Sequence, residues 1–289
     1  MTIIYLTFGE KMEYHVQAYL SMLSFRRQIA DTDHIVMVTT APQMYRHVQD
    51  WVEVITIDDH TIKEWQGEYQ FFWRVKIKVI EWIGQRYPDD DLLWLDCDTV
   101  LSGSIDWLKQ QLAAGHGLMD RDEGHPSRMK TKTLRMWKMV AGRTYGDVTL
   151  GLRHDMYCAG VVGIPCGKRE QVVNTALALC DGMLSEGAER IVIEQYSLSV
   201  ALFEKVGSLV ETKDCIAHYW SMKEEWMEAA HSIIAKSFLQ GSMLDEELRF
   251  FDEIDWKRIP VFAHKSNTAR RVKGFIDRIF PSRNLRYVE

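Results

Sequence analysis

The chain has 289 residues, of which 46% are hydrophobic and 26% are charged, which suits one large globular domain or one domain with insertions. Its net charge of −6 gives no reason to expect a nucleic-acid partner, and no apolar run approaches the roughly 20 residues that span a bilayer. The five cysteines form no Cys-x-x-Cys pair, and the chain enters a strand-like segment at Thr2 without a signal peptide. We therefore expect free thiols and a cytoplasmic protein.

Strand and helix patterns alternate in the first half of the chain. Short apolar runs predict strands, and longer runs with a helical period predict helices. This order favours an α/β fold with a mostly parallel sheet covered by helices. The first turn after a strand has neither a dinucleotide-binding glycine pattern nor a P-loop. The predicted strands are residues 3–7, 34–40, 52–57 and 92–95, and the predicted helices are residues 13–29 and 71–86.

The second half is less regular. Residues 117–126 are polar and predict a loop, and residues 127–140 predict a helix. Residues 156–165 are apolar and punctuated by glycine, which is typical of strands that another group approaches closely. Two further helices are predicted at 171–182 and 190–203. We expect one domain over residues 1–260 and a C-terminal extension over 261–289.

The most informative segment is Leu-Leu-Trp-Leu-Asp-Cys-Asp-Thr-Val-Leu at positions 92–101. An apolar strand delivers two carboxylates, Asp96 and Asp98, to the point where it ends. Two carboxylates held close together repel each other unless they are protonated or bridged by a cation. A hard divalent ion is the simplest bridge, and ligands of open α/β sheets bind beyond the carboxyl ends of the strands. An isolated pair of this kind could also be two surface acids that cap a strand.

A second motif, His218-Tyr-Trp-Ser-Met-Lys223, follows a short apolar stretch far downstream. Neutral imidazole is a metal ligand, and lysine is a point charge that suits phosphate. The motif is weak alone, because a histidine near a lysine is ordinary surface sequence. The metal-site interpretation of this motif is strengthened by its position far downstream of the acidic pair in an α/β chain.

Together, these motifs resemble those of the retaining glycosyltransferases of GT-A fold, in particular glycosyltransferase family 8, over roughly residues 1–225. The resemblance implies a GT-A-like, Rossmann-like domain that binds a nucleotide-sugar, with UDP as the expected nucleotide. It implies that Asp96, Asp98 and His218 bind Mn²⁺ or Mg²⁺, and that Lys223 contacts the diphosphate. Cys158 stands where the family often has Asn. The implied donor-binding residues are Thr7, Phe8, Arg74, Lys78, Asp96, Ala159, Gly160 and Lys223.

Glu194 and Gln195 resemble the acidic residue and the glutamine that lie beneath the donor sugar in this family, although the family often has Asp where this chain has Glu194. With Lys223, they are the expected catalytic residues. Retention needs either attack from the face that the leaving group departs from or a protein nucleophile. Since an amide is a poor nucleophile, we favour front-face attack with Gln195 as an electrostatic or hydrogen-bonding partner. Glu194 could be the nucleophile only if it points at the sugar.

Two alternatives come from other classes of protein. An apolar strand followed by Asp-x-Asp also resembles haloacid-dehalogenase-type phosphatases, in which Asp96 would be the nucleophile, Asp98 the acid/base and Mg²⁺ the cofactor. Three predicted strands precede the motif here, and the acidic pair that closes the metal site of those enzymes does not follow it. The second alternative is a protein that binds nucleotide-sugars without turnover.

The C-terminal extension is basic and amphipathic. Its last 26 residues hold seven Lys and Arg against two acidic residues. Residues 269–280 predict a helix with an apolar face, which would either bind the inner face of a membrane or dock on the domain. Membrane contact would suit a glycan or glycolipid acceptor. The apolar face consists of Val272, Phe275, Ile276, Ile279 and Phe280.

Overall fold

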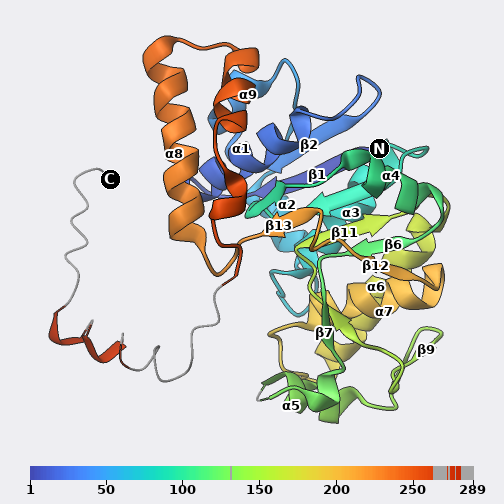
Figure 1. Ribbon diagram of the computed structural model, residues 1–289. Helices are drawn as coiled ribbons and strands as arrows, with labels where there is room; N and C mark the ends of the chain where they lie inside the picture. Colours follow the sequence, from blue (N-terminus) through green and yellow to red (C-terminus); the bar gives the residue numbers. More distant parts are fainter. Residues whose placement is uncertain (131, 263–271, 273, 277, 281–289) are drawn as a thin grey trace.

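The computed structural model describes residues 1–130 and 132–262, together with 272, 274–276 and 278–280. Its centre is a seven-stranded sheet in the order β12-β6-β11-β4-β1-β2-β3 (Figure 1). All neighbouring pairs are parallel except those of β11, which runs antiparallel to β4 and β6. The expected α/β class with a mostly parallel sheet is therefore confirmed. The strands are β1 Thr2–Thr7, β2 His34–Thr39, β3 Glu53–Thr56, β4 Leu92–Leu95, β6 Gly117–Met119, β11 Val161–Ile164 and β12 Leu209–Glu211.

Helices cover both faces of this sheet (Figure 1). One core contains Ile4 and Trp94 and is covered by α3, α6 and α7, and the other contains Tyr5 and Leu95 and is covered by α1, α4 and α8. Successive strand residues enter opposite cores because their side chains alternate between the two faces. The helices are α1 Met12–Arg26, α2 Asp59–Trp65, α3 Arg74–Arg86, α4 Ile105–Ala113, α5 Lys132–Val140, α6 Arg169–Ser185, α7 Ile193–Val206, α8 Lys223–Gln240 and α9 Leu244–Asp252.

Three short antiparallel pairs lie beside the main sheet. The pair that matters for function joins β5, Thr99–Leu101, to β13, Ile216–His218, with His218 opposite Thr99. This register places the late motif directly beside the acidic pair, although about 120 residues separate them in sequence. The other two pairs join β7, Asp122–Gly124, to β10, Met156–Tyr157, and β8, Thr144–Tyr145, to β9, Val148–Thr149.

The predicted elements of the first half are confirmed, with small shifts at their ends. The predicted helix 71–86 begins only at Arg74, after a turn. The predicted loop 117–126 is wrong, because it contains β6 and β7, whose three residues each are too few to show a period. The predicted helix 127–140 begins only at Lys132, after a 3₁₀ turn that starts at Pro126.

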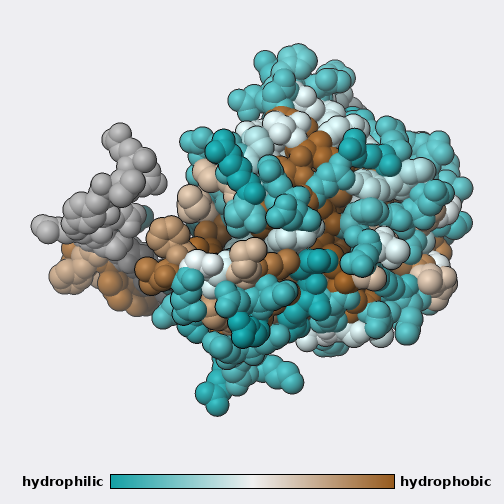
Figure 2. All heavy atoms as spheres, turned by 90° about the horizontal axis from the view of Figure 1, so that it is seen from above, coloured by the Kyte–Doolittle hydropathy of each residue, from teal (hydrophilic) through white to brown (hydrophobic). Residues whose placement is uncertain are grey.

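Helices α8 and α9 were not predicted. They pack on α1 and bury Trp226 and Phe251 in the second core. All five cysteines are free thiols. Within the ranges given above, no helix is both long and apolar enough to cross a membrane. Seen from above, hydrophilic side chains surround a band of apolar ones (Figure 2).

Candidate active site

The acidic pair begins where β4 ends. The backbone N–H of Asp96 donates to the carbonyl of Gly160 at 2.8 Å, and the indole of Trp94 donates to Asp96 Oδ1 at 2.9 Å. The carbonyl of Asp98 accepts a hydrogen bond from the N–H of Tyr219 at 3.0 Å. The backbone of each acidic residue is thus held by a hydrogen bond to a segment that lies far away in sequence.

His218 lies between two carboxylates, those of Asp98 and Asp120. Its Nε2 lies 3.4 Å from Asp98 Oδ1, and its Nδ1 lies 2.8 Å from Oδ2 of Asp120. Ligand atoms of Asp96, Asp98 and His218 lie within 4.8 Å of one another. The imidazole rests directly on Gly160, where a Cβ would lie 2.2 Å from His218 Cε1. Only glycine leaves room for the ring in this position.

Charged partners decide the protonation of this cluster. Burial alone would raise the pKa of Asp98, but hydrogen bonds and charge from His218 and Lys223 hold it well below its usual range. Burial lowers the pKa of His218, but hydrogen bonds with Asp120 and Asp98 outweigh this and raise it well above its ordinary value. Lys223 Nζ lies 2.8 Å from Asp98 Oδ2. In the absence of an ion, positive charge from His218 and Lys223 balances the carboxylates.

The donor set fits a divalent ion. Two carboxylates and one imidazole suit Mn²⁺ and Mg²⁺ by their oxygen content, and the imidazole suits Mn²⁺ better. Nδ1 of His218 lies 2.8 Å from the fully buried Asp120, so a neutral imidazole that donates Nδ1–H to Asp120 would present Nε2 to an ion beside Asp98. A carboxylate behind a histidine in this way is typical of metal-binding histidines. Asp120 was not predicted, and its only sequence signal is its place after the three-residue β6.

A pocket of ≈ 240 Å³ lies beside the two carboxylates. Thr7 and Phe8 line it from the end of β1, and Phe8 packs edge-on against Phe72 at 4.6 Å between ring centroids. Lys76 and Lys223 also line the pocket, so two cations and two carboxylates face one small space. Aromatic walls beside such charges suit a nucleotide diphosphate.

Lys76 is the buried cation of the site. Its Nζ lies 2.8 Å from Glu194 Oε1 and 3.1 Å from Asp96 Oδ1, and it donates to the carbonyl of Ala159 at 3.0 Å. Burial lowers the pKa of Lys76, but Asp96 and Glu194 outweigh it and raise the pKa above its ordinary value. Burial raises the pKa of Glu194 in spite of Lys76. Sequence reasoning missed Lys76.

Arg74 and Lys78 do not line the pocket. Arg74 donates to both carboxylate oxygens of Asp181, at 2.7 and 2.9 Å, and Lys78 pairs with Glu81 on its own helix. Arg74 and Lys78 share one face of α3 because they are four residues apart, and Lys76 lies on the opposite face. Any contact with a donor would require these two side chains to leave their partners.

Glu194 and Gln195 lie in the first turn of α7 and point in different directions. Glu194 is buried against Lys76, whereas Gln195 Nε2 donates to Glu123 Oε2 at 2.8 Å. Adjacent helix residues are rotated by about 100°, so only one of them can face a given ligand. Ala159 and Gly160 contribute through their carbonyls, which hold Lys76 and Asp96.

Neither a protein-family profile nor a curated protein sequence matches this chain. Solved structures of similar fold include mouse xyloside xylosyltransferase 1 in its apo form, with a TM-score of 0.47 and 10% identity over 73% of this chain and 85% of that one. The galactosyltransferase LgtC with donor and acceptor sugar analogues has a TM-score of 0.46 and 12% identity over 73% of both chains. An active-site mutant of LgtC has a TM-score of 0.47 and 13% identity over 73% of this chain and 72% of that one. These structures are a xylosyltransferase and a galactosyltransferase by name.

Proposed function

We propose that the protein is a divalent-metal-dependent glycosyltransferase that moves a sugar from a nucleotide-diphosphate donor, a UDP-sugar, to a glycan or glycolipid acceptor. One observation carries the proposal: ligand atoms of Asp96, Asp98 and His218 converge within 4.8 Å beside an aromatic pocket. Sequence motifs alone suggested this cluster, and the convergence of its ligand atoms supports a divalent-ion site.

Each charged residue then has a role in the departure of the nucleotide. A bound Mn²⁺ or Mg²⁺ would neutralise charge on the leaving diphosphate. Lys223, at the first position of α8, would exchange its contact with Asp98 for the phosphates. Lys76 holds Asp96 in place from behind and balances Glu194.

We further propose that the sugar is transferred with retention by front-face attack. Glu194 is ion-paired with Lys76 and buried, which makes it a weak nucleophile and a positioning residue. Gln195 lies on the neighbouring face of α7, where its amide donates to Glu123, and it would have to leave this partner to contact the sugar or the acceptor. The replacement Glu194→Gln should then lower turnover without abolishing it, whereas a nucleophile would be indispensable.

The phosphatase alternative is less well supported by the site. It requires Asp98 to give up a proton as a general acid, but His218 and Lys223 hold the pKa of Asp98 well below its usual range. A carboxylate of this kind stays ionised at neutral pH and is a poor acid. A protein that only binds nucleotide-sugars would show no turnover of them, so a turnover assay distinguishes this alternative from the enzyme.

Metal-dependent hydrolysis of nucleotide-sugars is the test, because slow hydrolysis needs no known acceptor. We expect hydrolysis of one UDP-sugar with Mn²⁺ and none after EDTA treatment. Calorimetry should show that UDP binds far more tightly with Mn²⁺ than without it, and that Asp98→Asn removes the difference. Equal UDP affinity with and without Mn²⁺ would contradict the proposal.

We also propose that the C-terminal segment contacts an anionic membrane surface. The five apolar side chains of its predicted helical face, among the described residues, are 50–74% exposed rather than packed on the domain. Basic residues next to such a face add electrostatic attraction of about 1 kcal/mol each at an anionic surface. Most of the basic residues themselves lie outside the described residues.

A further inference from the structure

A second cleft, of ≈ 730 Å³, adjoins the pocket beside Asp96 and Asp98. We call the pocket beside these carboxylates the donor pocket, after its proposed ligand. Phe72 and Trp73 line both spaces. Its other walls are α5 and the segment 187–191, which leads directly into α7. The second cleft therefore borders the donor pocket, and its lining segment ends at Ile191, three residues before Glu194. This is where a transferase needs its second substrate.

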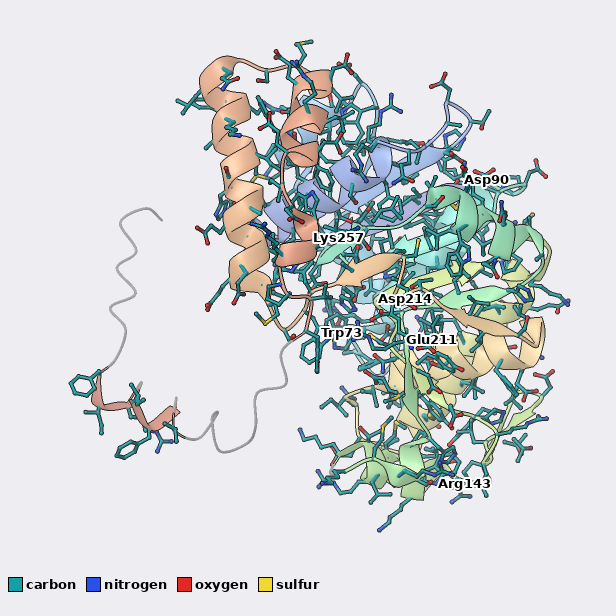
Figure 3. All side chains as sticks on the ribbon, viewed as in Figure 1. Trp73, Asp90, Arg143, Glu211, Asp214 and Lys257 are labelled. Carbon is teal, nitrogen blue, oxygen red and sulfur yellow. The ribbon has the colours of Figure 1, made fainter. Side chains whose placement is uncertain are left out.

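The second cleft has an apolar platform at its surface. Trp73 is 51% exposed, and Met139 and Ile191 are also exposed. Trp73 lies between the upper part of the molecule, which carries α8 and α9, and the lower part, which carries α5 (Figure 3). An exposed indole beside a pocket offers a flat face on which the C–H side of a sugar ring can pack.

The polar part of the second cleft is positively charged. Lys132, Arg135 and Arg190 line it together with one carboxylate, that of Glu189. Arg135 is ion-paired with Glu189 at 2.8 Å. In the part of the chain that the structure describes, neither Lys132 nor Arg190 has a carboxylate partner. The cleft thus keeps two uncompensated cations on a chain whose net charge is −6.

We infer that the second cleft binds a negatively charged sugar as the acceptor. The inference rests on the proposed glycosyltransferase function and names the substrate class of that site. The ring of the acceptor packs on Trp73, and its anionic group lies between Lys132 and Arg190. A hydroxyl of the same ring then faces the donor pocket past Phe72 and Trp73, the two residues that line both spaces.

Binding of two matched probes to the full-length protein tests the inference. p-Nitrophenyl β-glucuronide and p-nitrophenyl β-glucoside have the same ring and differ in charge. Calorimetry with Mn²⁺ and UDP present, and again without them, should show the glucuronide binding roughly fivefold more tightly, the size expected for exposed ion pairs. The advantage should shrink as salt is raised.

Charge reversals localise the effect. Lys132→Glu and Arg190→Glu should each remove the preference for the glucuronide. Lys138→Glu makes the same change on the same helix but outside the cleft, and it should leave the preference intact. Trp73→Ala should weaken both glycosides alike, because it removes the platform and not the charge.

Several outcomes would overturn the inference. The inference is wrong if neither glycoside binds, or if both bind equally well. It is also wrong if the preference for the glucuronide survives both Lys132→Glu and Arg190→Glu. Inorganic phosphate that binds as tightly as the glucuronide would show a bare anion site instead of a sugar-acid site. Failure of the glycosyltransferase proposal is read separately, from the absence of Mn²⁺-dependent UDP binding in the same protein.

Discussion

Replacing Gly160 with alanine should damage the metal site through a single methyl group. The new Cβ would lie 2.2 Å from Cε1, 2.4 Å from Nδ1 and 2.8 Å from Nε2 of His218, which is far inside normal contact distance. The imidazole must move, because the backbone of Gly160 accepts a hydrogen bond from Asp96 and leads directly into β11 of the central sheet. The hydrogen bond from His218 to Asp120 then breaks or lengthens, and Nε2 no longer faces Asp98.

The expected magnitude has two parts. Overpacking of a filled interior costs about 1–3 kcal/mol, which for a domain of this size lowers Tm by about 2–4 °C per kcal/mol. Loss of the orientation of a metal-binding histidine costs about 10–100-fold in metal affinity. Thermal melting should show the first effect, and calorimetry of UDP with and without Mn²⁺ should show the second.

Gly163→Ala, in strand β11 and three residues after Gly160, is the matched control. Its Cβ would lie 2.7 Å from the side chain of Leu118, so it overpacks the core without touching the site. Both variants should melt earlier, but only Gly160→Ala should lose the Mn²⁺-dependent part of UDP binding. Full Mn²⁺-dependent binding in a folded Gly160→Ala protein would refute the assigned role of His218.

Four further results are expected. Asp120→Asn should weaken Mn²⁺ binding about 10–100-fold, because it removes the carboxylate that orients His218, and unchanged affinity in a metal titration would contradict this. Lys223→Ala should lower kcat more than UDP affinity, because charge on the diphosphate grows towards the transition state; a change in KM alone would make Lys223 only a binding residue. The pKa of His218 is raised in the folded protein without metal, so its protonation stabilises the fold. This contribution is complete below the unfolded-state pKa of about 6.5 and is lost as the pH rises through the folded-state pKa. Because the ion replaces that proton, the rise in Tm caused by Mn²⁺ should grow over the same range, and a rise independent of pH would show that His218 is not a ligand. A protein that ends at residue 262 should keep its Tm and lose binding to anionic vesicles in co-sedimentation, whereas an early melting transition would favour a docked C-terminal helix.

The sequence predicted the central sheet because its strands are short, apolar and separated by helices of ordinary length. Leu92 to Leu95 is buried on both faces, so a run of uninterrupted apolar residues identified it directly. The same run predicted where Asp96 and Asp98 lie, since residues that follow a buried strand emerge at the end of the sheet where that strand stops.

Other parts of the site depend on packing that no short pattern reveals. Three cations alternate at positions 74, 76 and 78 of α3, and only the helix orientation shows that the middle one faces the carboxylates. Asp120 follows a strand of three residues, and its partner His218 is 98 residues away. The convergence of these groups is a property of the tertiary fold.

The ladder between β5 and β13 has a consequence for synthesis on the ribosome. It pairs Thr99 with His218, so the histidine joins the two carboxylates only after most of the chain has been made. A nascent chain that ends before β13 contains the acidic pair but lacks the imidazole. The strands that hold the two sides in register are only three residues long, and a slip of one residue would present Ala217 or Tyr219 in place of His218. Tight metal binding would therefore indicate that β5 and β13 have paired in the correct register.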